Sequence, residues 1–85
     1  MRETYIERDR DRGVDATYRW LIEEVGELAR AIRKTDHDNL VLEFSDVLAW
    51  TASLANLLDI DLDEAMERYV RGCPKCGSSP CRCPL

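Results

Sequence analysis

The ten residues "VLEFSDVLAW" at positions 41–50 have the pattern of a buried helix that carries two acids, Glu43 and Asp46. An α-helix turns by about 100° per residue, so Asp46 and a run of apolar residues fall within roughly 60° of Glu43. An unpaired carboxylate on an apolar face costs several kcal/mol or changes its pKa. These two acids therefore need a partner. The apolar residues on the same face are Leu40, Val47, Trp50, Leu54 and Leu57.

The composition describes one small, strongly helical domain. A chain of 85 residues buries a limited core, and such chains often add a metal, disulfides or a partner subunit. Hydrophobic residues make up 45% and charged residues 34%, which favours a folded protein over a disordered one. The net charge of −5 argues against a general nucleic-acid binder, which would show a basic face.

Neither a secretion signal nor a membrane span is expected. The first residues, "MRETYIERDRDRG", lack the apolar segment of a signal peptide, and no stretch approaches the roughly 18 apolar residues of a membrane-spanning helix. We therefore expect a cytoplasmic protein without a membrane partner.

The spacing of apolar residues predicts an all-α fold. Leu21, Val25, Leu28 and Ile32 recur at helical intervals, and no strand alternation or internal repeat is present. We expect a bundle of about four helices, completed by oligomerisation into a dimer or tetramer because one chain supplies so little core. The predicted helices span about 2–12, ending near Gly13; 16–34, with Asp15 as N-cap; 40–58, capped by Asp36 or Asp38; and 62–71, between Asp61 and Gly72.

Two pairs of acids share one spacing. Glu24 and Glu27 lie at i and i+3, as do Glu43 and Asp46, so each pair lies on one face of its helix. The short loop "TDHDN" between the two helices predicts an antiparallel hairpin that brings the four carboxylates together. Four like charges at one point need a counter-charge, and hard oxygen ligands favour magnesium or manganese.

A plainer interpretation stays open for the first pair. Glu23, Glu24 and Glu27 lie off the apolar stripe of their helix, so they also suit a solvated face with ion pairs to Arg19 or Arg30. Glu43 and Asp46 favour the metal site, because a solvated face does not account for them.

"EEVGEL" followed by "EFSDVLAW" resembles the EExxE…ExxD signature of MazG-type nucleotide pyrophosphohydrolases, in the all-α NTP pyrophosphatase superfamily. The resemblance covers roughly residues 15 to 68 and implies magnesium-dependent cleavage of nucleoside triphosphates to monophosphates and pyrophosphate. It assigns metal binding to Glu24, Glu27, Glu43 and Asp46, and it gives Glu23 a catalytic role near the attacking water. It also suggests a part in nucleotide-pool house-cleaning.

The resemblance is incomplete where the family contacts phosphate. Family members often carry a lysine and an asparagine in or after the last helix, whereas this chain has Arg68 there and no asparagine after Asn56. We therefore expect arginines to contact the phosphates, and the candidates are Arg8, Arg12 and Arg68, each of which also suits an ordinary surface position.

The last residues form a second compositional unit, which divides the chain into a pyrophosphohydrolase domain at 1–72 and a tail at 73–85. Four cysteines in a chain without a leader favour metal over disulfides. Four thiolates suit a structural zinc ion, and a bridge between cysteines two residues apart would be strained. The cysteines are Cys73, Cys76, Cys81 and Cys83.

Two functions from different classes follow. The first is an NTP pyrophosphohydrolase with a zinc-bound tail. The alternative is a catalytically silent helical module that uses its carboxylates to bind metal or a partner. Acids at all four ligand positions favour the enzyme, because a decayed site would have lost at least one of them.

Overall fold

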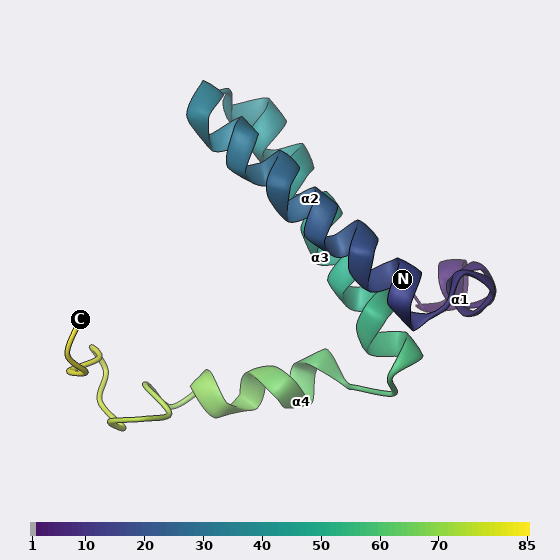
Figure 1. Ribbon diagram of the computed structural model, residues 1–85. Helices are drawn as coiled ribbons and strands as arrows, with labels where there is room; N and C mark the ends of the chain where they lie inside the picture. The colour runs from purple at the N-terminus through teal and green to yellow at the C-terminus, as the bar shows by residue number, and fades with distance from the viewer. Residues whose placement is uncertain (1) are drawn as a thin grey trace.

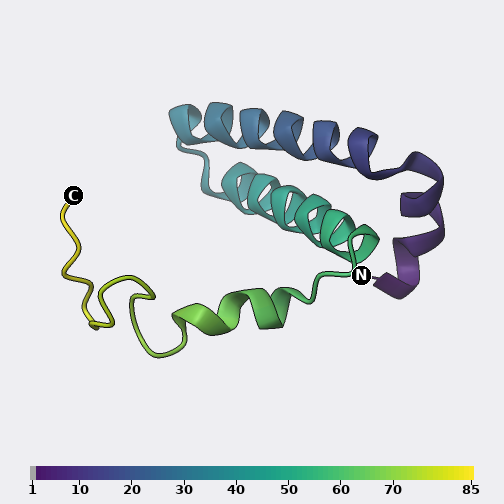
Figure 2. The same cartoon turned by 60° about the horizontal axis from the view of Figure 1, so that its bottom comes forward.

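The computed structural model describes residues 2–85 and is all-helical over that range, as predicted (Figure 1). Two long helices, α2 and α3, run antiparallel, and α1 crosses the end of the hairpin where α2 begins and α3 ends (Figure 2). A short helix, α4, and a 3₁₀ turn, η1, lead away from that end into the tail. The elements are α1 (Arg2–Arg12), α2 (Val14–Lys34), α3 (His37–Leu57), α4 (Leu62–Met66) and η1 (Glu67–Tyr69).

Gly13 starts α2, so the prediction that Asp15 caps this helix is wrong. Gly13 has φ +87°, a conformation that suits glycine and lets the chain turn sharply after α1. Its carbonyl accepts hydrogen bonds from the backbone N–H of Thr17 (3.1 Å) and from the Thr17 hydroxyl (2.7 Å). Asp15 lies in the first turn instead, where its carboxylate is 3.0 Å from the guanidinium of Arg19 in an exposed ion pair.

Of the two caps predicted for the third helix, Asp36 is correct. Its carboxylate accepts from the backbone N–H groups of Asp38 and Asn39, at 3.2 and 3.5 Å. Thr35 ends α2 in the left-handed conformation, with φ 53°, so α3 begins at once and includes His37. Helix α3 is therefore three residues longer at its start than predicted.

Asp61 caps α4 as predicted, with its carboxylate 2.9 Å from the backbone nitrogen of Asp63. The helix is shorter than expected, because it ends at Met66 and tightens into η1 before Gly72. A segment with so little packing on the rest of the chain lacks the tertiary contacts that sustain most helices.

A single chain has a very small hydrophobic core. Among residues 2–85, Ala31 and Ala55 are the only hydrophobic residues that are buried. By length and composition alone, helix α3 is long and apolar enough to cross a membrane, whereas no such stretch was expected from the sequence. The core helix of a soluble protein meets the same criterion. The described chain therefore leaves much apolar surface uncovered.

A buried ion pair within α1 positions Arg12 against the hairpin. Asp9 is only 1% exposed, and its carboxylate lies 2.9 Å from Nη1 of Arg12. The same nitrogen donates to the hydroxyl of Thr17 at 3.3 Å, and the Arg12 guanidinium lies 4.6 Å from the ring centroid of Trp50. Arg12 therefore joins α1, α2 and α3.

Replacing Arg12 with alanine should destabilise the protein, because it leaves the buried carboxylate of Asp9 without a counter-charge. We expect a loss of about 3 kcal/mol in the free energy of unfolding, measured in urea at fixed protein concentration. Arg8→Ala, on the same helix but exposed, should change it by less than about 0.5 kcal/mol. Equal effects of the two substitutions would contradict the role given to the ion pair.

Candidate functional site

Three of the predicted metal ligands meet between α2 and α3. Glu24 lies on α2, and Glu43 and Asp46 lie one turn apart on α3. One carboxylate oxygen from each of the three falls within 4.8 Å of the others, close enough for a single metal ion to contact all three. The antiparallel packing predicted from the sequence is what brings them together.

Glu24 and Glu43 are partly buried and Asp46 is exposed, and none of the three forms an ion pair within residues 2–85. Oε2 of Glu43 is buried and has no hydrogen-bond partner among residues 2–85. Burial raises the pKa of Glu24 above its ordinary value of 4.5, and the charges of Asp46, Glu43, Glu27 and Glu23 raise it further. A buried acceptor without a donor and a carboxyl group that resists ionisation both fit a site built for a cation.

The other two acids of the "EEVGEL" motif point elsewhere. Oε1 of Glu27 lies 3.2 Å from the guanidinium of Arg30, and Glu27 is not part of the three-acid cluster. This is the ion pair that the plainer interpretation anticipated for Glu27. Glu23 is exposed beside Glu24. Metal binding by Glu27 and a catalytic role for Glu23 stay predictions, and the first requires the pair with Arg30 to open.

The three candidate arginines occupy very different surroundings. Arg12 is held by Asp9 and Thr17 as described, and Arg8 is exposed on α1. Arg68 lies in η1, with its guanidinium 5.4 Å from the ring centroid of Tyr69. Contact with phosphate stays a prediction for each of them.

Two tryptophans stack beside the acids. The rings of Trp20 and Trp50 are 5.8 Å apart between centroids and inclined by 13°, so Trp50 packs in the seam, the role that the sequence favoured for it. Trp20 precedes Glu24 by one helical turn and Trp50 follows Asp46 by one turn, a rise of about 6 Å in each case. The stack therefore borders the acidic cluster.

A small cavity lies on the far side of Trp50 from the acids along α3. Its volume is about 230 Å³. Asp9, which lines this cavity, was not predicted from the sequence, where its only local signal is the i, i+3 spacing to Arg12. The lining residues are Tyr5, Asp9, Arg12, Ala49, Trp50 and Ser53.

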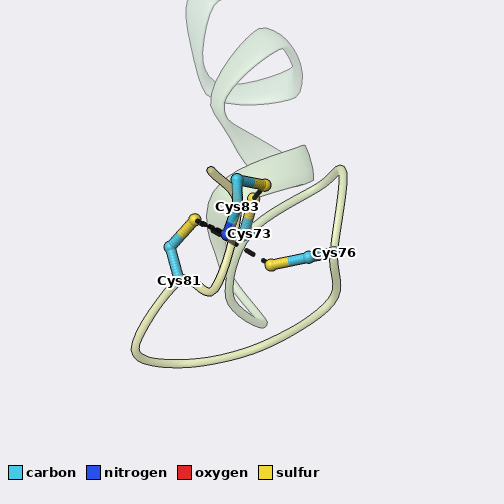
Figure 3. Close-up of side chains that lie close together, drawn as sticks. All are labelled: Cys73, Cys76, Cys81 and Cys83. Atoms are coloured by element: carbon cyan, nitrogen blue, oxygen red, sulfur yellow. Dashed lines mark hydrogen bonds between the residues drawn. The ribbon is translucent and has the colours of Figure 1, made fainter. Parts of the chain in front are cut away.

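The four cysteines of the tail come together as well (Figure 3). All four are free thiols, and their sulfur atoms lie within 4.8 Å of one another, which is compatible with a zinc site. The backbone N–H groups of Arg82 and Ser78 lower the pKa of Cys76 to about 6, while the neighbouring thiols, Cys73 foremost, raise that of Cys83 to about 11. This cluster shares no residue with the acidic one.

The helical fold and the acidic cluster agree with the family of nucleotide pyrophosphohydrolases, hydrolases that act on acid anhydrides. The chain belongs to the MazG family: the model of the MazG nucleotide pyrophosphohydrolase domain matches residues 12–75. The match includes α2, α3 and α4 and reaches the first cysteine of the tail. Among curated proteins, none matches the chain. The division of the chain at residue 72 stays a prediction.

The raised pKa of Glu24 predicts how pH and magnesium act on stability. The folded state holds the Glu24 proton more tightly than the unfolded state, so the free energy of unfolding should fall as pH rises from 4.5 through the raised pKa. Magnesium should offset this repulsion, and its stabilising effect should be larger at pH 7 than at pH 5. Thermal unfolding with and without magnesium, at both pH values, measures the effect.

Glu24→Gln is the matched variant for this experiment. It removes the titrating group and one charged ligand, so the dependence of the melting temperature on pH and on magnesium should both weaken. Unchanged dependence in Glu24→Gln would show that another group is responsible.

Proposed function

We propose that the protein is a magnesium-dependent nucleoside triphosphate pyrophosphohydrolase, which converts NTPs or dNTPs to monophosphates and pyrophosphate. The family supports the reaction class. The main observation that supports placing the reaction at this site concerns Glu43. It lies close to Glu24 and Asp46, and its buried Oε2 has no hydrogen-bond partner among residues 2–85. Manganese has the same preference for oxygen ligands and should substitute for magnesium.

In this proposal the three clustered acids bind the metal. When bound, magnesium offsets the negative charge of the triphosphate and activates water for attack on the α-phosphorus. Glu24, Glu43 and Asp46 project from two packed helices, so their geometry is fixed before substrate arrives. Glu27 would become the fourth ligand once it leaves Arg30, and Glu23 would orient the water.

The reaction is a hydrolysis without a covalent enzyme intermediate. Water adds to the α-phosphorus, the bond from that phosphorus to the bridging oxygen breaks, and pyrophosphate leaves. The sequence has no GxxxxGK phosphate-binding loop, and the acidic cluster contains no nucleophile paired with a histidine. Binding of the triphosphate by an acidic site therefore depends on the metal.

Isosteric amides test the site. Glu43→Gln and Asp46→Asn remove a charged ligand and keep the side-chain volume, so hydrolysis should fall by orders of magnitude. Glu7→Gln, an exposed position on α1, is the matched control and should keep full activity. Release of monophosphate and pyrophosphate is measured with a panel of ordinary and damaged nucleotides, which also tests a role in nucleotide-pool house-cleaning.

Three results would count against this function. Full activity of Asp46→Asn, or hydrolysis that continues when divalent metal is left out, would show that the acids do not take part in the reaction. A wild-type protein that binds magnesium but hydrolyses none of the nucleotides would favour the silent helical module instead.

We also propose that the protein works as a homo-oligomer. Helix α2 carries an apolar stripe that α3 does not cover, and α3 exposes an apolar face of its own, where Leu48 is 66% exposed. A second copy of the chain would cover both surfaces and supply the core that one chain lacks. The exposed stripe on α2 consists of Val14, Tyr18, Ile22, Val25 and Ile32, and the face on α3 of Val41, Phe44 and Leu48.

Light scattering measures the assembly directly. The wild-type protein at micromolar concentration should give a multiple of the 9.8 kDa chain mass, two or four chains. Leu48→Glu should reduce that mass, because it places a charge in the proposed interface, whereas Leu85→Glu at the exposed C-terminus should not. A wild-type mass of one chain would refute the proposal.

A further inference from the structure

The tail has little besides its cysteines to fold it. Residues 73–85 contain no helix or strand, and all of them are exposed or only partly buried. Two backbone hydrogen bonds close a loop there: the N–H of Gly77 donates to the carbonyl of Cys73 at 2.7 Å, and the N–H of Cys73 donates to the carbonyl of Ser78 at 3.1 Å. A hydrophobic core is lacking in this segment, so another interaction must hold it.

The sulfur positions match the edges of a tetrahedron around zinc. A Zn–S bond of about 2.3 Å in a tetrahedral site places neighbouring sulfur atoms about 3.8 Å apart. The Sγ atoms of Cys73 and Cys83 are 3.6 Å apart, and those of Cys76 and Cys81 are 3.9 Å apart. Figure 3 shows the four side chains converging from the two arms of the loop.

Two of the sulfur atoms accept hydrogen bonds from backbone N–H groups, which favour the thiolate form. The backbone N–H of Arg82 donates to Sγ of Cys76, and the N–H of Cys83 donates to Sγ of Cys81, both at 3.3 Å. Four thiolates and a dication carry a net charge of −2, and Lys75 and Arg82 contribute +2 within the same segment, which has no acid. Thiolate ligands select a soft ion such as zinc over magnesium.

The backbone of the loop depends on glycine. Gly72 has φ +117°, and a Cβ added there would lie 3.1 Å from the carbonyl oxygen of Ser78. Gly77 has φ +74°, with open space around the position of its absent Cβ. A side chain at residue 72 would therefore meet both backbone strain and a close contact where the loop closes.

We propose that Cys73, Cys76, Cys81 and Cys83 bind one zinc ion that folds residues 73–85 as a unit, independently of the acidic site. Four protein ligands leave no open position on the ion, so its role is structural rather than catalytic. The proposal goes beyond nucleotide hydrolysis and does not depend on it, because the two clusters share no residue.

Metal analysis of the full chain, purified without chelator, tests the site. We expect about one zinc per chain, which Cys76→Ser should lose and the exposed-position control Ser79→Ala should keep. Cobalt in place of zinc should give the absorption bands of a tetrahedral thiolate complex. Two disulfides in the purified protein, or Cys76→Ser with undiminished zinc, would overturn the proposal.

Two further readouts separate this site from the acidic one. Loss of zinc from Cys76→Ser should collapse the amide chemical-shift dispersion of residues 73–85 while the circular dichroism of the helices persists. Glu43→Gln should keep its zinc, whether or not the wild-type protein hydrolyses nucleotides. Retained order in the zinc-free tail would refute the role of zinc in folding residues 73–85, and loss of zinc from Glu43→Gln would refute the independence of the two sites. Gly72→Ala should bind zinc more weakly than Ser79→Ala. Equal zinc retention by the two variants would show that the conformation of Gly72 does not contribute to the site.

Discussion

Repulsion among the acids between α2 and α3 is the constraint on which the rest of the molecule depends. Glu24, Glu43 and Asp46 lie close together, with Glu24 and Glu43 partly buried, and Oε2 of Glu43 has no hydrogen-bond donor among residues 2–85. The packing of the two helices creates this repulsion, and the proposed cation would relieve it. A divalent ion bound there would stabilise the hairpin by offsetting the charge that the packing brings together.

The small hydrophobic core makes the whole chain depend on charged and polar interactions as well. With so few hydrophobic side chains buried, the fold relies on charged and polar links such as the one that Arg12 makes to Asp9 and Thr17. When one partner of such a link is removed, the other charge stays buried in an apolar environment without a counter-charge. This costs more free energy than the link itself contributes. Small domains of this kind gain stability from outside the chain, from metal ions and from other subunits.

Most of the fold and the central part of the site could be predicted from the sequence. Helical spacing gives the hairpin, and the position of Glu43 and Asp46 among apolar residues identifies them as more than surface acids. The sequence did not distinguish Glu27 from the acids of the cluster. Arg30 follows Glu27 by three residues, a spacing that suits an ion pair, and the two side chains do pair. The start of α2 was missed because Gly13 takes a positive φ, which the sequence permits but does not require.

The fourth helix and the ion pair of Asp9 illustrate the same difficulty. The sequence pattern continued to Gly72, but the segment after Leu57 packs mainly on itself, so α4 ends early. The burial of Asp9 depends on the crossing of α1 over the hairpin, where Trp50 of α3 lies against Arg12, the ion-pair partner three residues after Asp9 on α1. Contacts of this kind are decided by the tertiary arrangement and leave no periodic signal.

The departure of α4 from the end of the hairpin gives the chain a natural junction for fusion. The segment that follows Asn56 leads outward, and its ordered loop closes on itself between Cys73 and Ser78 (Figures 1 and 2). Another module joined after Tyr69 would leave the contacts among α1, α2 and α3 intact, because those contacts are all made earlier in the chain. Exchange of the tail is thus open to evolution, and to protein engineering, without any change to the acidic cluster.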